Sequence, residues 1–219
     1  MSLKAVFFDL DGVLVISENL HYYAWEKVLD GLKVDHPSFD FKEVLGFSDE
    51  QVAKFLSQKY ALSSPLEELT AQKRKHFAQY IQKGFASPLG RDEFLNFLKN
   101  RNKPKLILAV VSSCLRSEIE MILKEENILS YFDFLIGSDE VSHSKPEPDP
   151  YLLALKTAQI APQEALVIED SPTGITAALG AQIPVFGMAT TVPSLPGHSE
   201  IPFFKNFKEI QLKLSNSKF

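Results

Sequence analysis

Apolar residues along the chain fall into short continuous runs, and longer segments with helical spacing separate them. We expect strands at residues 5–8, 106–111, 132–136, 165–168 and 184–186, and amphipathic helices at residues 91–99 and 115–126. Strands that alternate with helices in this way indicate a doubly wound α/β fold, with a mostly parallel sheet and helices on both faces.

The pattern changes after the first strand, because helical segments there follow one another without intervening strands. We expect these helices at residues 19–32, 41–45, 49–60 and 65–83. Pro88 and Gly90 mark the return to alternation, and residues 203–219 end the chain with a short strand and a helix. The sequence therefore predicts a core of residues 1–15 and 88–219, with a helical insert of residues 16–87 over one end of the sheet.

Composition narrows the class of protein. The 219 residues carry a net charge of −5 and a pI of about 5.6, which argues against nucleic acid or an anionic membrane as the main partner. The single cysteine, Cys114, cannot form an internal disulfide and suits a reducing compartment. No apolar stretch is long enough to cross a bilayer, and Asp9 and Asp11 interrupt any signal-peptide core. We expect a soluble cytoplasmic protein, a monomer or weak dimer.

Polar residues follow the expected strands at the points where these strands end. They are Asp9 and Asp11, then Ser112 and Ser113, then Lys145 in a proline-rich loop, and finally Glu169 and Asp170. The carboxyl ends of parallel strands meet at one edge of a sheet, where open α/β sheets bind ligands. Carboxylates gathered there repel one another unless a cation offsets them, and their oxygens suit Mg²⁺ together with a substrate phosphate.

In this ordered set the chain resembles the haloacid dehalogenase superfamily of aspartyl phosphotransferases. The motifs are Asp9-Leu10-Asp11-Gly12-Val13, Ser112, Lys145 within Lys145-Pro146-Glu147-Pro148-Asp149, and Glu169-Asp170-Ser171. The helical insert resembles the cap of the β-phosphoglucomutase-like branch. The resemblance covers nearly the whole chain and implies a Rossmann-like core that carries a helical cap.

The resemblance also implies a role for each of these residues. Asp9 is the expected nucleophile, and Asp11 the acid that protonates the leaving group and then the base that activates water. Asp9, the Asp11 carbonyl and Asp170 are the expected Mg²⁺ ligands, with Glu169 either a direct ligand or a neighbour of one. Ser112 and Ser113 are expected to bind the phosphoryl group, and Lys145 to offset its charge.

Simpler interpretations stay open for single residues. Ser112 or Asp170 could cap the helix that follows, and Lys145 could be a solvated loop lysine. Asp149 is expected only to cap a helix whose first turn holds Pro150.

In the helical insert, His21 and Lys75 match polar positions of the branch and are candidate substrate contacts. His21 could instead pack between helices, and Lys75 could belong to a solvated face. Residues 45–50 match the loop that holds the distal phosphate of a bisphosphate in β-phosphoglucomutase. Leu45 and Asp49 stand where that enzyme has two cations, and Asp49 would repel such a phosphate.

We therefore expect a Mg²⁺-dependent phosphatase that acts on a small phosphorylated metabolite through an aspartyl phosphate. Asp11 and Asp170 favour phosphate chemistry over dehalogenation, which needs neither a metal nor an acid for the leaving group. A sugar-phosphate mutase is the alternative enzyme. A non-catalytic ligand-binding protein of the same fold is the alternative from another class.

Overall fold

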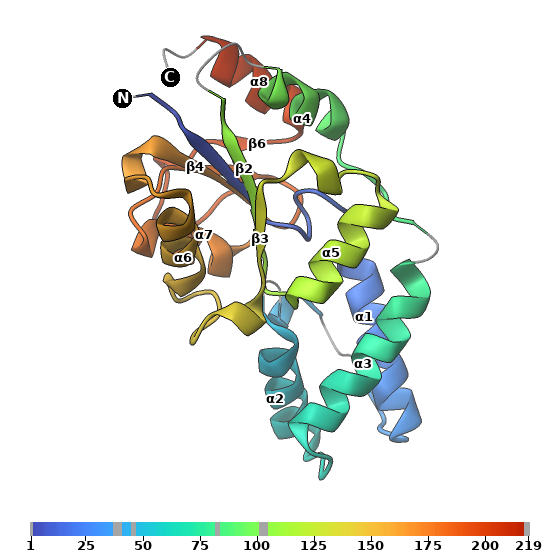
Figure 1. The fold of residues 1–219 in the computed structure, drawn as a ribbon. Helices are drawn as coiled ribbons and strands as arrows, with labels where there is room; N and C mark the ends of the chain where they lie inside the picture. Colours follow the sequence, from blue (N-terminus) through green and yellow to red (C-terminus); the bar gives the residue numbers. More distant parts are fainter. Residues whose placement is uncertain (1, 37–40, 45–46, 82–83, 101–104, 217–219) are drawn as a thin grey trace.

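The computed structural model describes residues 2–36, 41–44, 47–81, 84–100 and 105–216 (Figure 1). The ends of three expected helices, at residues 45, 82–83 and 217–219, lie outside these ranges. Among the described residues, no helix is both long and apolar enough to cross a membrane.

A six-stranded sheet forms the centre of the fold. Its spatial order is β3-β2-β1-β4-β5-β6, and all neighbouring strands pair in parallel. The strands are β1 (Ala5–Phe8), β2 (Ile107–Val111), β3 (Phe134–Ile136), β4 (Ala165–Glu169), β5 (Val185–Met188) and β6 (Phe203–Phe204). The expected doubly wound α/β fold is confirmed, and the strand boundaries differ from the expected ones by up to two residues.

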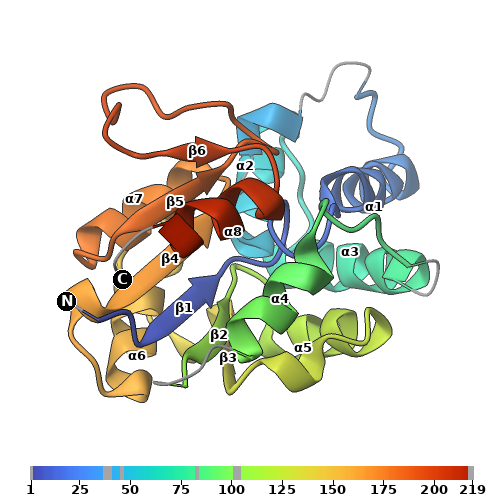
Figure 2. The ribbon, with the colours of Figure 1, turned by 90° about the horizontal axis from the view of Figure 1, so that it is seen from above.

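Alternate residues of each central strand point to opposite faces, which gives the sheet two separate cores. One face packs against α4 (Arg91–Lys99), α5 (Arg116–Glu125) and α8 (Phe207–Asn216), and the other against α6 (Asp149–Ala158) and α7 (Pro172–Gly180) (Figure 2). In β1, Val6 and Phe8 join the first core, whereas Ala5 and Phe7 join the second. Because both faces are covered, β1 is apolar at every position.

The helical insert comprises α1 (Glu18–Gly31), the short helix η1 (Phe41–Val44), α2 (Asp49–Tyr60) and α3 (Leu66–Ile81). Figure 1 shows these helices beyond one end of the sheet. They enclose a third apolar cluster around Trp25, Leu29, Leu56 and Leu69. The insert therefore has a core of its own and can present a face to the strand ends.

Candidate active site

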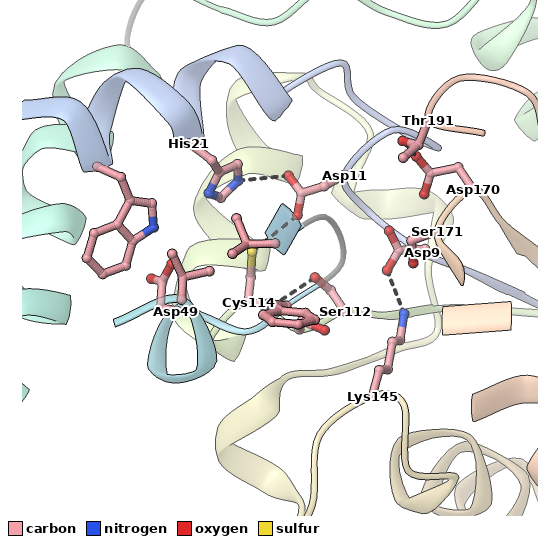
Figure 3. A pocket seen from close by; sticks show the side chains of 15 residues that line it. Asp9, Asp11, His21, Asp49, Ser112, Cys114, Lys145, Asp170, Ser171 and Thr191 are labelled. Atoms are coloured by element: carbon pink, nitrogen blue, oxygen red, sulfur yellow. Dashed lines mark hydrogen bonds and ion pairs between the residues drawn. The ribbon is translucent and has the colours of Figure 1, made fainter. Parts of the chain in front are cut away.

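The strand ends bring the expected polar residues together. Asp9 follows β1, Ser112 follows β2, and Asp170 follows β4. Because β1 pairs in parallel with both β2 and β4, these residues lie along one edge of the sheet (Figure 3). Lys145, from the loop between β3 and α6, points its side chain at Asp9.

Lys145 is buried and makes three polar contacts. Its Nζ donates to Asp9 Oδ1 at 2.6 Å, to Glu169 Oε1 at 2.6 Å and to the Val111 carbonyl at 2.9 Å. Burial alone would lower the pKa of this lysine, but Asp9 and Glu169 outweigh it and raise the pKa well above 10.5. Lys145 is thus a charged group inside the site and not a solvated loop lysine.

Glu169 is fully buried, and both of its oxygens accept hydrogen bonds. Besides Lys145, Oε1 accepts from the Tyr151 hydroxyl at 3.2 Å. Oε2 accepts from the backbone N–H groups of Asp170 and Ser171, at 2.9 and 3.0 Å, and from the Ser171 hydroxyl. These contacts fix Lys145 and the turn after β4, so Glu169 is tied into the protein on both sides.

Asp9, Glu169 and Asp170 form a cluster of three carboxylates whose candidate ligand atoms lie within 4.8 Å of one another. Burial raises the pKa of Asp9 to about 8, against the opposing ammonium of Lys145. A cluster with only oxygen donors suits a hard cation such as Mg²⁺, so the residues present fit the metal that the sequence predicts.

The turn after β5 supports Asp170. The Thr191 hydroxyl donates to Asp170 Oδ2, and a Cβ on Gly12 would lie 1.8 Å from the same oxygen. Position 12, with a φ of 77°, therefore has to be glycine for the carboxylate to fit. Ser171 provides the cap of α7 by accepting from Gly174 N at 3.1 Å, so Asp170 is not the capping residue.

Asp11 points away from this cluster towards the helical insert (Figure 3). Its Oδ1 accepts from the Ser17 hydroxyl and lies 3.0 Å from His21 Nε2, and its Oδ2 accepts from Cys114 Sγ at 3.2 Å. Burial would raise the pKa of Asp11, but these groups, His21 foremost, outweigh it and hold the pKa below the ordinary value. In this arrangement Asp11 is an anion.

His21 connects Asp11 to the interior of the helical insert. Its Nδ1 lies 2.8 Å from Lys73 Nζ, which also pairs with Asp49 Oδ1 at 2.7 Å. An ammonium can only donate, so Nδ1 accepts and Nε2–H donates to Asp11. Lys73 is completely buried in α3, whereas Lys75 is exposed and does not line the site. The inward cation of this helix is therefore Lys73 and not the expected Lys75.

The remaining sequence candidates separate into site and surface residues. Ser112 and Ser113 both line the pocket, and Ser112 Oγ accepts from Cys114 N at 3.0 Å. Since α5 begins only at Arg116, Ser112 is not its cap. The expectation that Asp149 caps α6 is wrong. Pro148 holds the cap position, and Asp149 lies in the first turn with its carboxylate 2.9 Å from His143 Nδ1.

A pocket that is partly open to solvent lies between the strand ends and the helical insert. Asp9, Asp11, Ser112, Lys145 and Asp170 line its sheet side. The expected phosphate-contact loop begins with residues 45 and 46, which lie outside the described residues. Sequence reasoning missed Cys114, Lys73 and Thr191 as members of the site.

Comparison with known proteins gives a family match and related sequences. Residues 6–188 match the family model described as haloacid dehalogenase-like hydrolase. The chain is 28% identical over 185 residues to a phosphorylated carbohydrates phosphatase of Thermotoga maritima, covering 83% of this chain and 82% of that protein. It is 32% identical over 193 residues to the validoxylamine A 7'-phosphate phosphatase of Streptomyces hygroscopicus, covering 86% of each.

Solved structures share the fold. CbbY from Rhodobacter sphaeroides, crystallised in complex with phosphate, superposes with a TM-score of 0.83 at 24% identity, covering 95% of this chain and 96% of that one. A β-phosphoglucomutase from Clostridium difficile gives a TM-score of 0.81 at 22% identity and covers 97% of each chain. The expected family is confirmed by the match over residues 6–188.

Proposed function

Because this chain belongs to the haloacid dehalogenase-like hydrolase family, we propose that it is a Mg²⁺-dependent phosphatase acting on a small phosphorylated metabolite through an aspartyl phosphate. The observation that carries the proposal is the buried arrangement of Asp9, Lys145, Glu169 and Asp170 at the strand ends. Residues 16–87 would form a cap that closes the site, because α1–α3 stand beyond that edge of the sheet.

Asp9 and Asp170 would hold the metal with their carboxylates and Asp11 with its backbone carbonyl. When bound, Mg²⁺ would neutralise charge on the phosphoryl group. Glu169 belongs to the same cluster of carboxylates, but the hydrogen bonds on both of its oxygens favour an indirect role. It would hold Lys145 and the turn that carries Asp170 in place.

Asp9 would attack phosphorus, form a P–O bond and expel the alcohol of the ester. Lys145 occupies Asp9 Oδ1, which leaves Oδ2 for the attack. The Lys145 ammonium and the Ser112 hydroxyl would stabilise the charge that develops on the phosphoryl oxygens. Water would then hydrolyse the aspartyl phosphate, release inorganic phosphate and regenerate the Asp9 carboxylate.

Asp11 would supply the proton to the leaving alkoxide and later take one from water. In the structure it is an anion held by Ser17, His21 and Cys114. To act as an acid it has to take up a proton and turn from these donors towards the substrate. The proposal therefore couples the start of α1, which carries His21, to the acid step.

The named activities of the two relatives, dephosphorylation of phosphorylated carbohydrates and of a 7'-phosphate, support a phosphomonoester of a small molecule as the substrate. The site gives less support to a sugar-phosphate mutase. Asp49 occupies the position of a phosphate-binding cation in that enzyme, and here it pairs with the buried Lys73.

The test is release of inorganic phosphate from p-nitrophenyl phosphate and from a panel of phosphorylated metabolites. We expect activity with Mg²⁺, loss of activity on addition of EDTA, and loss in Asp9→Asn. Turnover by Asp9→Asn would remove the proposed nucleophile. Isomerisation of a hexose 1-phosphate in the presence of a bisphosphate primer, without phosphate release, would instead assign a mutase. Failure of beryllium fluoride to bind Asp9 with Mg²⁺ would favour a non-catalytic protein.

A further inference from the structure

The two walls of the pocket differ in chemistry. Eight of the nine residues that line it from the sheet side are aspartate, serine, threonine or lysine, and the ninth is Cys114. The helical insert contributes six residues, of which four are apolar: Trp25, Val44, Phe47 and Val52. The sheet side is thus suited to the phosphoryl group, and the insert offers an apolar wall to the alcohol portion of an ester.

Phe47 is the accessible member of this apolar wall. Phe47 is 36% exposed, whereas Trp25, Val44 and Val52 are at most 3% exposed and back the wall from inside the insert. A flat ring is the group that makes most contact with an aromatic face, and such pairs contribute beyond the area they bury.

The backbone around Phe47 is anchored. Phe47 N donates to the Val44 carbonyl at 3.0 Å, and the next residue, Ser48, forms a capping box with Gln51. Gln51 Nε2 in turn donates to the Lys145 carbonyl at 3.3 Å, which joins this part of the insert to the loop of the catalytic lysine. The start of α2, directly after Phe47, is therefore tied to the loop that carries Lys145.

The apolar wall offers no partner to a second anionic group. Among the described residues that line the pocket, the one lysine is Lys145. Its ammonium already donates hydrogen bonds to the carboxylates of Asp9 and Glu169. The charged carboxylate on the insert side is Asp49, and the Lys73 ammonium that neutralises it is completely buried behind it. The other cation beside this wall, Arg74, lies 3.6 Å from Asp49 Oδ2 and 3.9 Å from Glu118 Oε1, so a distal phosphate or carboxylate would have to compete with these carboxylates for it.

We propose that the pocket selects phosphomonoesters whose alcohol is uncharged and carries a flat aromatic ring, which lies against Phe47. Esters with a second anionic group are disfavoured because the cations beside this wall, Lys73 and Arg74, are already paired with Asp49. This inference rests on the proposed phosphatase activity and names the class of substrate for that same site.

Three esters with a common ribose test the inference: ribose 5-phosphate, uridine 5'-monophosphate, which adds a neutral ring, and ribose 1,5-bisphosphate, which adds an anion. We expect kcat/KM for the nucleotide to exceed that for ribose 5-phosphate about tenfold, and the bisphosphate to fall about tenfold below it. Phe47→Ala should lower the ratio of kcat/KM for the nucleotide to kcat/KM for ribose 5-phosphate about fivefold, and Phe47→Tyr should retain this ratio. Asp49→Asn should raise the relative rate of the bisphosphate.

Tyr23→Ala is the matched control, because Tyr23 is an exposed aromatic residue of α1 that does not line the pocket. This variant should leave both kcat/KM ratios unchanged, that of the nucleotide and that of the bisphosphate relative to ribose 5-phosphate. The inference would be overturned if the wild-type kcat/KM for the nucleotide did not exceed that for ribose 5-phosphate. It would also be overturned if Phe47→Ala left the ratio of these two values unchanged. In either case, release of phosphate would still support the proposed phosphatase. Absence of phosphate release from all three esters and from p-nitrophenyl phosphate would instead overturn the proposed function itself.

Discussion

The two chain segments that connect the helical insert to the sheet lie side by side. Ile16 N, on the outgoing segment, donates to the Ala86 carbonyl on the returning segment at 2.9 Å. Arg91, the first residue of α4, donates from its guanidinium to the Leu14 carbonyl just before the outgoing segment, at 3.1 Å. One arginine of the sheet unit therefore holds the start of this connection.

Glu126, directly after α5, holds the returning segment. Its carboxylate accepts from Phe85 N at 3.2 Å, from the Ser87 hydroxyl at 3.2 Å and from the Arg91 guanidinium at 2.7 Å. The side chain of Arg91 is 4% exposed and that of Glu126 is 10% exposed. This buried ion pair is thus shared by both connections between the insert and the sheet.

We predict that Glu126→Gln destabilises the protein by about 3 kcal/mol. Removal of one partner of a buried ion pair costs about 3–5 kcal/mol, because the other charge is left without compensation. Here Asp92, which is exposed and lies 2.7 Å from Arg91 Nε, stays as a partner, so the lower end of that range applies. Arg91→Met should cost a similar amount, and the double variant less than the sum of the two.

Urea unfolding followed by far-UV circular dichroism and by fluorescence measures this effect. Trp25 is the only tryptophan of the sequence and belongs to the apolar cluster of the insert, so its emission reports that part of the molecule. We expect both probes to shift to lower urea in Glu126→Gln, with a coupling energy to Arg91→Met of about 1–2 kcal/mol. A loss of stability below about 1 kcal/mol, or strictly additive variants, would refute the account of a shared buried pair.

Three further predictions concern the site. Thr191→Val removes the hydroxyl that orients Asp170 and should weaken Mg²⁺ binding about tenfold by calorimetry, and an unchanged affinity would contradict this role. His21→Leu removes the largest influence that lowers the pKa of Asp11, so the pKa should rise. Since only protonated Asp11 can act as an acid, the fall of kcat/KM for glycerol phosphate with rising pH should then occur at higher pH, and superimposable profiles would count against the coupling. Lys75→Ala should leave kcat and KM within about twofold, because Lys75 is exposed outside the pocket.

The sheet and the main site residues could be predicted because they follow from one physical constraint. A strand buried on both faces is a continuous apolar run, and parallel strands place the residues after such runs at one edge. This reasoning correctly brings Asp9, Ser112 and Asp170 together. The same reasoning applied to the run before Thr190 and Thr191 would also have indicated the support of Asp170.

The insert was harder to predict, because its polar residues face inwards from helices whose packing the sequence does not specify. In α3, Leu69, Lys73 and Phe77 recur every fourth residue, and all three are buried. That spacing indicates that Lys73, and not Lys75, lies on the buried face of the helix. A lysine on a buried helical face is, however, unusual unless it is paired. Its partners, Asp49 and His21, come from two other helices, so the pairing depends on tertiary structure.

The hydrogen bonds of Glu169 bear on how the proposed metal site would behave. Since both Glu169 oxygens are engaged within the protein, Asp9 and Asp170 are the members of the carboxylate cluster that remain to face a cation. Mg²⁺ takes six ligands and usually keeps several waters, so two carboxylates and one carbonyl leave positions for a phosphoryl oxygen. Metal and phosphate should therefore bind cooperatively, and by linkage each should raise the affinity for the other by the same factor. Titration of Mg²⁺ with and without inorganic phosphate measures that factor, and a value of one would indicate that the two do not share the site.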